Sequence, residues 1–511
     1  MNKVMKKAIA GITTVILLIT LIITSQPSSR INTFASSEKE TKATLTQAPK
    51  YVFMFIGDGM SFPQVQAASD YLGAVAQPAN RKILQGNKYL NFMKFPIAGS
   101  AITYDSTSFC PDSASTATSL ATGNKTYSGT INMDETMKIS YETITEKLKK
   151  QLGYKIGIIS TVNLNHATPA AYYAHQSSRN NYYAIGIEMV KSGFDYFAGG
   201  ALKNVTGDDK TKPQTNLYDM ARSSGYKVIK TQSEAAKLSA SDGKAIIIGE
   251  TLADSDSLSY SNDAKQGEWQ LKDYVKKGID VLDNKKGFFM MIEGGKIDWA
   301  CHANDAASTI ADTIAMDDAV GEAIKFYNKH PNETLILVTG DHETGGLTIG
   351  YAGTDYNTYL TNLTNQKLSY AKYDTDYVKN YKLKKTDFST VLSDIKKNFG
   401  LMASTDKDAS KDSKLVLTSY EYKLLENAYK KTLSGEISRD QEEYILYGTY
   451  EPLSVTITHI LNNKSGISFS SYAHTGLPVG VFAKGLGSEL FSGYYDNTQI
   501  YFNLANLLKV K

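Results

Sequence analysis

Continuous apolar runs of strand length alternate with amphipathic stretches of helical length along most of this chain. The runs at residues 51–56, 155–160 and 287–293 have the uninterrupted apolar character of strands that are buried on both faces. The stretches 269–282 and 306–327 carry apolar residues at helical spacing. This alternation predicts an α/β fold in which helices cover both faces of a mainly parallel sheet.

The character of the chain changes between about residues 350 and 450. This segment is rich in Tyr, Asn, Asp and Lys, includes a charged stretch at 404–414 that we expect to be a loop, and contains two predicted helices. We interpret it as an insertion or cap on one large domain that spans residues 50–511. The sequence has no internal repeat.

The apolar run at residues 8–24 has the flanks of an export signal. Three lysines precede the run, and small residues up to Ala35 offer a cleavage site. We therefore predict a signal peptide over residues 1–35, a polar flexible leader over 36–49 and a secreted protein. The run is intermediate in length between a signal core and a membrane-spanning helix, so an uncleaved N-terminal membrane anchor is the alternative.

Charge argues against one class of partner. The 511-residue chain has a formal net charge of +3, and residues 1–35 contain four basic and no acidic residues, so removal of this segment leaves +3 − 4 = −1. A near-neutral mature chain argues against non-specific binding of nucleic acid.

The chain has two cysteines, Cys110 and Cys301. Export permits a disulfide, and each cysteine lies near a candidate site residue. Because sequence does not give their separation, we favour two buried thiols over a disulfide.

Acidic and histidine residues gather where the predicted strands end. Asp58, Glu293 and the pair Asp341–His342 each follow an apolar run directly. Further candidates lie in turns marked by Gly or Pro, namely His166, Thr168, Asp298, His302 and His474, with 294–305 expected to be a loop and 471–476 a turn. Sites in open α/β sheets form beyond the carboxyl ends of the strands, so we expect these side chains to converge. Converging carboxylates would repel one another unless cations held them, and imidazole with carboxylate suits zinc, whereas carboxylate, hydroxyl and water suit magnesium.

The stretch 110–123 predicts a helix that places Ser113 in its first turn. Asp112 or Ser113 can cap the helix, and Gly123 ends it. The N-terminus of a helix favours an anion, so Ser113 is either a plain cap or a nucleophile that handles phosphate. Divalent cations could make its alkoxide available, and Arg179 could hold non-bridging phosphate oxygens, or be a surface arginine.

Together these segments resemble the alkaline phosphatase family. The shared motifs are Gly57-Asp58-Gly59-Met60, Pro111-Asp112-Ser113-Ala114 through Thr116-Ala117-Thr118 to Gly123, Ala167-Thr168-Pro169-Ala170, Glu293-Gly294 to Asp298 and His302, Gly340-Asp341-His342-Glu343-Thr344-Gly345-Gly346, and His474-Thr475. They follow the family's order and span roughly residues 50–510.

The resemblance implies a role for each matching position. Ser113 would be the nucleophile that becomes phosphoserine, and Arg179 the phosphate clamp. One Zn²⁺ would be held by Asp298, His302 and His474, a second by Asp58, Asp341 and His342 beside Ser113, and a third site for Mg²⁺ would be shaped by Asp58, Thr168 and Glu293. The family fold is a large mixed, mainly parallel sheet between helices, which implies a three-layer α/β/α sandwich, usually in a homodimer.

The third site departs from the best-studied bacterial members. His166 and Trp299 stand where those members carry an aspartate and a lysine, although other members share the His/Trp pair. An imidazole there could favour another divalent cation, softer than magnesium, and makes His166 a candidate ligand. The segment 350–450 matches no motif of the family.

The predicted function is that of a secreted, metal-dependent phosphomonoesterase that acts on small phosphorylated substrates, with activity rising above neutral pH. One alternative is a phosphodiesterase or phosphomutase of the same superfamily. A sulfatase is disfavoured, because the segment after Cys110 lacks the Cys-x-Pro-x-Arg run. An exported binding protein that kept the fold and lost catalysis is the alternative from another class.

Overall fold

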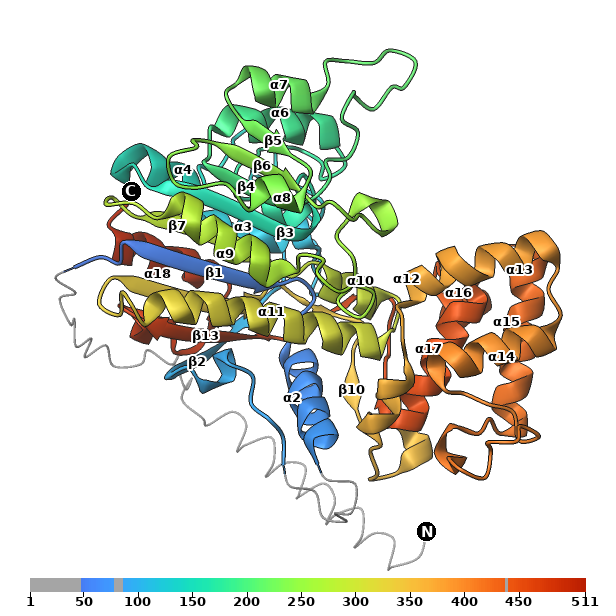
Figure 1. The fold of residues 1–511 in the computed structure, drawn as a ribbon. Coiled ribbons are helices and arrows are strands. Elements are labelled where there is room, and N and C mark those ends of the chain that lie inside the picture. Colours follow the sequence, from blue (N-terminus) through green and yellow to red (C-terminus); the bar gives the residue numbers. More distant parts are fainter. Residues whose placement is uncertain (1–46, 78–85, 437–439) are drawn as a thin grey trace, which may run out of the picture. The chain divides into compact units, whose positions relative to one another are not determined.

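A ten-stranded sheet runs through the computed structural model, which describes residues 47–77, 86–436 and 440–511 (Figure 1). In spatial order its strands are β14 (Gly493–Asp496), β2 (Ile97–Ile102), β13 (Val479–Gly485), β8 (Thr334–Gly340), β1 (Tyr51–Gly57), β7 (Phe288–Glu293), β3 (Lys155–Asn163), β4 (Tyr196–Gly200), β6 (Ala245–Ile248) and β5 (Lys227–Ile229). The predicted signal peptide and most of the predicted leader lie outside the described residues. Among the described helices, none combines the length and apolar character needed to cross a membrane.

The sheet is mixed and mainly parallel, as predicted. Every neighbouring pair from β8 to β5 is parallel, whereas β13 runs antiparallel to both β8 and β2. Strands β1, β7 and β8 are buried along their whole length. Their apolar runs are uninterrupted because helices cover both faces of these central strands.

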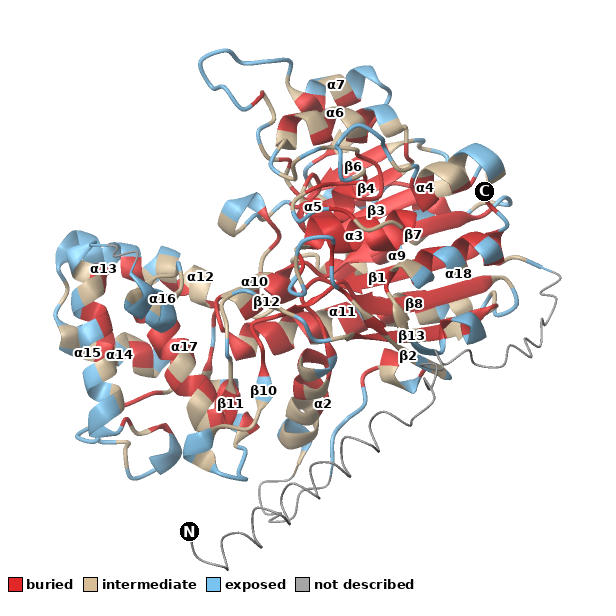
Figure 2. Ribbon diagram, turned by 180° about the vertical axis from the view of Figure 1, so that it is seen from behind, coloured by how far each residue is buried: buried red, intermediate tan, exposed pale blue. Residues whose placement is uncertain are grey.

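Two layers of helices enclose the sheet, which confirms the predicted three-layer α/β/α arrangement. Helices α9 (Leu271–Leu282) and α11 (Ala306–Tyr327) pack on one face, and α3 (Ser113–Thr122), α5 (Ala167–Ala170) and α18 (Thr498–Leu508) lie on the other (Figures 1 and 2). In α9 the buried residues recur at three- and four-residue spacing, as in Leu271, Tyr274 and Val275. That spacing forms the single apolar stripe that a helix needs to pack on a sheet.

A group of helices lies beside the sheet (Figure 1), and we call residues 350–466 the helical region. The chain enters it after β10 (Thr348–Ile349) and leaves it into β11 (Ile467–Ser468), two strands that pair antiparallel. Its helices are α12 (Tyr370–Tyr373), α13 (Lys379–Lys384), α14 (Phe388–Phe399), α15 (Ser419–Ser434), α16 (Gln441–Tyr447) and α17 (Pro452–Ser465). Helix α17 contacts α12, α14, α15 and α16, so it is the centre of this group.

Three local predictions were wrong. The expected loop at 294–305 contains helix α10 (Lys296–His302), which the preceding Gly294–Gly295 pair concealed. The expected turn at 471–476 contains β12 (His474–Thr475), which pairs with β9 (Glu343–Thr344), a partner more than a hundred residues away. Cys110 is exposed although Cys301 is buried, because Cys110 lies in the surface loop between β2 and α3.

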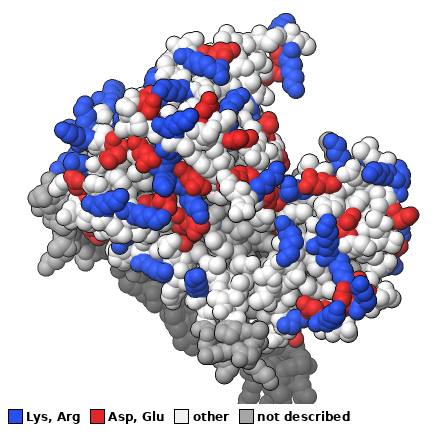
Figure 3. Space-filling model, in the orientation of Figure 1, with Lys and Arg blue, Asp and Glu red and all other residues white. Residues whose placement is uncertain are grey.

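Basic and acidic side chains are interspersed on the face of the molecule in Figure 3. This mixture agrees with the nearly balanced totals of 55 basic and 52 acidic residues. A surface of mixed sign does not concentrate the potential that a polyanion would follow.

Candidate active site

Three adjacent parallel strands bring three carboxylates to one edge of the sheet. Strand β1 lies between β7 and β8, with Ile56 opposite Glu293 and Gly57 opposite Gly340. Glu293 therefore ends β7, while Asp58 and Asp341 are the first residues after β1 and β8. All three side chains are fully buried.

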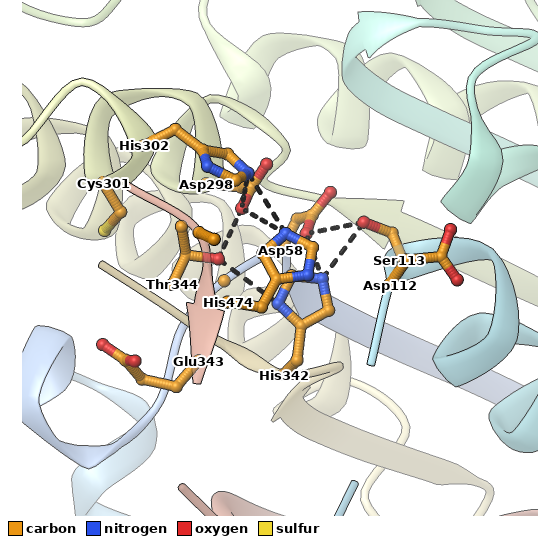
Figure 4. Close-up of polar contacts among 12 residues, drawn as sticks. Asp58, Asp112, Ser113, Asp298, Cys301, His302, His342, Glu343, Thr344 and His474 are labelled. Atoms are coloured by element: carbon orange, nitrogen blue, oxygen red, sulfur yellow. Dashed lines mark hydrogen bonds and ion pairs between the residues drawn. The ribbon is translucent and has the colours of Figure 1, made fainter. Parts of the chain in front are cut away.

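Helix α3, which lies on the face of the sheet opposite α9 and α11, brings Ser113 to the same edge. Asp112 caps the helix by accepting a hydrogen bond from Ser115 N (3.1 Å), and Ser113 is its first residue. The buried Ser113 Oγ lies 3.1 Å from His342 Nε2 and 3.4 Å from Asp58 Oδ1 (Figure 4). The hydroxyl therefore faces an imidazole and a carboxylate at a helix N-terminus, where backbone N–H groups favour negative charge.

The first group of possible metal ligands consists of Asp298, His302 and His474. Asp298 and His302 are four residues apart on α10, so they share one face of the helix. His302 Nε2 lies 3.3 Å from Asp298 Oδ1 and 3.1 Å from His474 Nε2, and His474 Nε2 lies 3.6 Å from Asp298 Oδ1. These are distances that a small cation between the three atoms would span.

Backbone carbonyls fix which nitrogen of each imidazole faces the group. The Nδ1 atoms of His302 and His474 donate to Tyr472 O and Pro111 O, each at 2.6 Å. A carbonyl only accepts, so each Nδ1 carries a proton and each ring turns its Nε2 atom toward the group. The two Nε2 atoms lie 3.1 Å apart, and their lone pairs could bind a cation placed between them.

The second group consists of Asp58, Asp341 and His342, whose ligand atoms lie within 4.8 Å of one another. His342 Nε2 is 3.4 Å from Asp58 Oδ1 and 3.4 Å from Asp341 Oδ2. Thr344 Oγ1 donates to Asp298 Oδ1 at 2.5 Å and lies 3.3 Å from His342 Nδ1, from which it can accept. The hydroxyl thus links the two groups, and a bond from His342 Nδ1 to it would turn the Nε2 lone pair toward Ser113, Asp58 and Asp341.

The two groups contact each other closely. The rings of His342 and His474 stack with centroids 3.7 Å apart, and Asp298, His342 and His474 also place their ligand atoms within 4.8 Å of one another. His342 therefore lies between both groups.

Electrostatics at this edge also fit bound cations. Burial raises the pKa of Asp58 and Asp341 well above the usual range, and the neighbouring carboxylates raise both further. Burial lowers the pKa of His342, and His474 lowers it further. Without a positive ion the buried carboxylates favour their protonated forms, and cation binding would release those protons.

A third set of polar atoms lies on the other side of Asp58. Asp58 Oδ2, Thr168 Oγ1 and Glu293 Oε1 are buried, and none of these three atoms has a hydrogen-bond partner among the described residues. Burial raises the pKa of Glu293 to about 7, although a hydrogen bond from Ser160 Oγ to Glu293 Oε2 holds it down. Leaving buried polar atoms without partners is costly, at about 1–3 kcal/mol each. This set therefore fits a third cation, with Asp58 shared between two sites.

His166 and Trp299, the pair that departs from the best-studied bacterial members, lie side by side. Their rings meet edge to face with centroids 5.9 Å apart. Burial and the nearby Arg179 lower the pKa of His166 to about 3, so its ring is neutral and able to bind a metal.

Arg179 lies at the mouth of the site and is held by Asp112. Its Nη1 donates to Asp112 Oδ2 at 2.8 Å. Burial opposes the charge of Asp112, but Arg179 and the backbone N–H groups of Gly129 and Ser115 together outweigh burial and lower the Asp112 pKa to about 2. The guanidinium is therefore oriented beside the start of α3 and carries a full charge.

A cavity of about 330 Å³ opens over these side chains, with Arg179, His166, Asp298 and His302 in its wall. Tyr370 and Tyr450 of the helical region complete the wall. Sequence reasoning missed both tyrosines, because segment 350–450 matched no motif. It also missed Asp112 as the partner of Arg179, and Thr344 as a link, although both lie inside the quoted motifs.

Comparison with known proteins gives consistent matches. The family model described as Alkaline phosphatase matches residues 49–510. Alkaline phosphatase 4 of Bacillus subtilis (strain 168) is 30% identical over 471 residues, which cover 91% of this chain and 89% of the relative. The crystal structure of a cold-active alkaline phosphatase from Shewanella sp. matches with a TM-score of 0.71 and 27% identity, covering 90% of this chain and 99% of that one. The TAB5 alkaline phosphatase of an Antarctic bacterium, in a variant with aspartate in place of a histidine and with Mg bound, matches with a TM-score of 0.59 and 24% identity, covering 91% and 99%.

Proposed function

Because the chain belongs to the alkaline phosphatase family, we propose that it is a secreted phosphomonoesterase that works through a phosphoserine at Ser113. The observation that carries this proposal is the position of Ser113 Oγ. It is buried at a helix N-terminus, 3.1 Å from His342 Nε2 and 3.4 Å from Asp58 Oδ1. A plain capping serine would instead bond to its own helix, as Asp112 does here.

The three sets of polar atoms suggest three cation sites. Asp298, His302 and His474 would hold one zinc ion, and Asp58, Asp341 and His342 a second. Asp58, Thr168 and Glu293, with His166, would hold a third divalent cation, either magnesium or a softer ion that accepts imidazole. Bound cations would supply Lewis-acid stabilisation of the negative charge that develops during phosphoryl transfer.

The chain's own residues would bind and attack the substrate. Arg179, oriented by Asp112, would hold two non-bridging oxygens of the phosphoryl group through its guanidinium. Ser113 Oγ would attack phosphorus while the bond to the ester oxygen breaks, and the leaving alcohol would take a proton. Water would then attack the phosphoserine, which releases inorganic phosphate and restores Ser113. The N–H groups at the start of α3 would stabilise the anion in both steps.

The rest of the predicted organisation belongs to this proposal. Residues 1–35 would direct export and residues 36–49 would form the leader. Residues 50–511 would form one catalytic domain in a homodimer, with the helical region as its cap. Support for the cap comes from Tyr370 and Tyr450, which line the cavity over the proposed ligands.

Phosphate trapping by Ser113 variants tests the proposal. Ser113→Ala should lose covalent phosphate labelling in acid-quenched mixtures and most turnover of p-nitrophenyl phosphate, while it retains its metal content. Ser119→Ala is the matched control, because Ser119 is buried in the same helix and its hydroxyl bonds to Ser115 O (3.1 Å). Labelling that persists in Ser113→Ala would place the nucleophile elsewhere, and a wild-type chain that cleaves diesters faster than monoesters would point to a phosphodiesterase.

A further inference from the structure

The carbonyl that orients His302 belongs to a residue whose side chain reaches the helical region. His302 Nδ1 donates to Tyr472 O at 2.6 Å. This bond holds the ring so that Nε2 faces Asp298 and His474. The position of the Tyr472 backbone therefore sets the position of one proposed zinc ligand.

Aromatic and polar contacts fix the Tyr472 side chain against the helical region. Its Oη donates to Leu446 O, near the end of α16, at 2.7 Å. Its ring lies 6.2 Å from the rings of Tyr444 and Tyr450 and 5.8 Å from that of His459. All four partners lie between residues 444 and 459, so this end of the helical region packs against the half-buried Tyr472 ring.

Gly448 permits this close approach. A Cβ at Gly448 would lie 2.7 Å from the Tyr472 ring, and its φ of +60° is one that other residues rarely adopt. A side chain at this position would therefore displace either the tyrosine ring or the loop after α16.

A second contact ties the same segment to the helix that carries His302. Asn304, just after α10, donates from Nδ2 to Ser471 O at 2.9 Å. Its Oδ1 lies 3.0 Å from His459 Nε2, and its backbone carbonyl accepts from Asn462 Nδ2 at 2.7 Å. Both of these partners belong to α17. The helical region therefore contacts the segment around Tyr472 directly, through the Tyr472 side chain, and indirectly, through Asn304.

His474 is held differently. Its Nδ1 donates to Pro111 O, next to the nucleophile helix. Different carbonyls therefore orient the two rings of the first group, and of these two only the Tyr472 carbonyl belongs to a residue whose side chain contacts the helical region.

We propose that Tyr472 is a positioning residue that couples the helical region to the zinc ligand His302. This inference rests on the proposed function, because it concerns one of the proposed zinc sites. Groups that orient metal ligands typically contribute about 10- to 100-fold to metal affinity. Loss of the Tyr472 ring should therefore weaken one zinc site and leave the second largely intact.

Zinc release from the purified, zinc-loaded enzyme tests the coupling. A coloured chelator should remove one zinc equivalent from Tyr472→Ala about 10-fold faster or more than from wild type, with the other equivalent unchanged. Tyr472→Phe, which removes only the bond to Leu446 O, should give a smaller increase. After cobalt substitution, the visible spectrum of Tyr472→Ala should change, because the His302 ring is free to turn.

Tyr422→Ala is the matched control, since the Tyr422 ring packs on Phe388 within the helical region. It should release zinc as wild type does. The inference would be overturned if Tyr472→Ala released zinc at the wild-type rate. It would also be overturned if Tyr472→Ala and Tyr422→Ala both released both zinc equivalents faster by the same factor. Either result would leave the proposed function standing. If Tyr472→Ala does not fold, Tyr472→Phe and Gly448→Ala give the same comparison, and wild-type release from both would overturn it. A wild-type chain that retains no zinc would overturn the proposed function and this inference together.

Discussion

Single residues decide which atoms are presented to the centre of the site. Thr344 shows this most clearly, because one hydroxyl donates to Asp298 and lies within accepting distance of His342. The carbonyls of Tyr472 and Pro111 accept hydrogen bonds from Nδ1 of His302 and His474 and so orient these two imidazoles. Each ligand is therefore oriented before a cation binds, which reduces the ordering that binding requires.

Arg179 should matter for phosphate recognition. Arg179→Ala should raise KM for p-nitrophenyl phosphate and Ki for inorganic phosphate by roughly 10- to 100-fold, because hydrogen bonds to charged groups contribute about 1.5–3 kcal/mol. Steady-state kinetics with phosphate as inhibitor measure both constants. Arg222→Ala is the control, since Arg222 pairs with Asp219 on the exposed surface of α7 (Leu217–Ser223). Unchanged phosphate inhibition in Arg179→Ala would remove Arg179 from the site.

At the scale of elements, apolar runs predicted the central strands well and short elements poorly. Strands β1, β7 and β8 are buried on both faces, so each contains a continuous apolar run. Strand β12 is two residues long and exists only through its pairing with β9, which no local pattern reveals. Long-range pairing is therefore what the sequence pattern lacked.

A histidine outside the site joins two helices and should make stability depend on pH. His175 lies 3.4 Å from Glu146 on α4 (Ile144–Lys147) and 3.3 Å from Glu188 on α6 (Tyr182–Ser192). Burial opposes its charge, but the two glutamates outweigh burial and raise its pKa from 6.5 to about 10. A raised pKa means that the folded state binds this proton more tightly than the unfolded state does.

The stabilisation from His175 should therefore be complete below about pH 6.5 and should disappear as pH rises to about 10. Thermal unfolding of wild type and His175→Gln between pH 6 and 10.5 measures it. The difference in Tm between the two proteins should be largest near pH 6 and should shrink toward pH 10. A difference that is constant across this range would contradict the prediction.

At the scale of the whole molecule, the sheet edge was predictable and the cavity over it was not. Asp58, Glu293 and Asp341 could be identified because each follows an apolar run at the same edge. Tyr370 and Tyr450 could not, because their place in the cavity wall depends on how the helical region packs. Sequence patterns report which face of an element is buried, but they do not report which distant element buries it.

Removal of cations should destabilise the whole molecule, and more so at high pH. A ligand that binds only the folded state at 100 times its Kd adds about 2.7 kcal/mol of stability. In the metal-free protein, burial raises the pKa of Asp58, Asp341 and Glu293, that of Glu293 to about 7. The stability of the metal-free protein that comes from these protonated carboxyl groups is therefore present below the usual carboxyl pKa. It is lost as pH rises through about 7.

Calorimetry of chelated and zinc-loaded protein at pH 5 and pH 8 tests this prediction. The drop in Tm on chelation should be larger at pH 8, and zinc should restore Tm and turnover together. A chelated protein with wild-type turnover, or with the same Tm as the loaded protein at pH 8, would contradict it.

The register of β7, β1 and β8 has a consequence for how this enzyme can change over evolution. Adjacent strands are about 4.8 Å apart, so backbone hydrogen bonding between the strands fixes the spacing of the three acidic residues. A one-residue insertion in β1 would turn Asp58 to the opposite face, so this part of the gene should tolerate little change in length. Loops that hold none of the proposed ligands or their orienting groups carry no such constraint, and new substrate preferences can arise there without altering the distances on which chemistry depends.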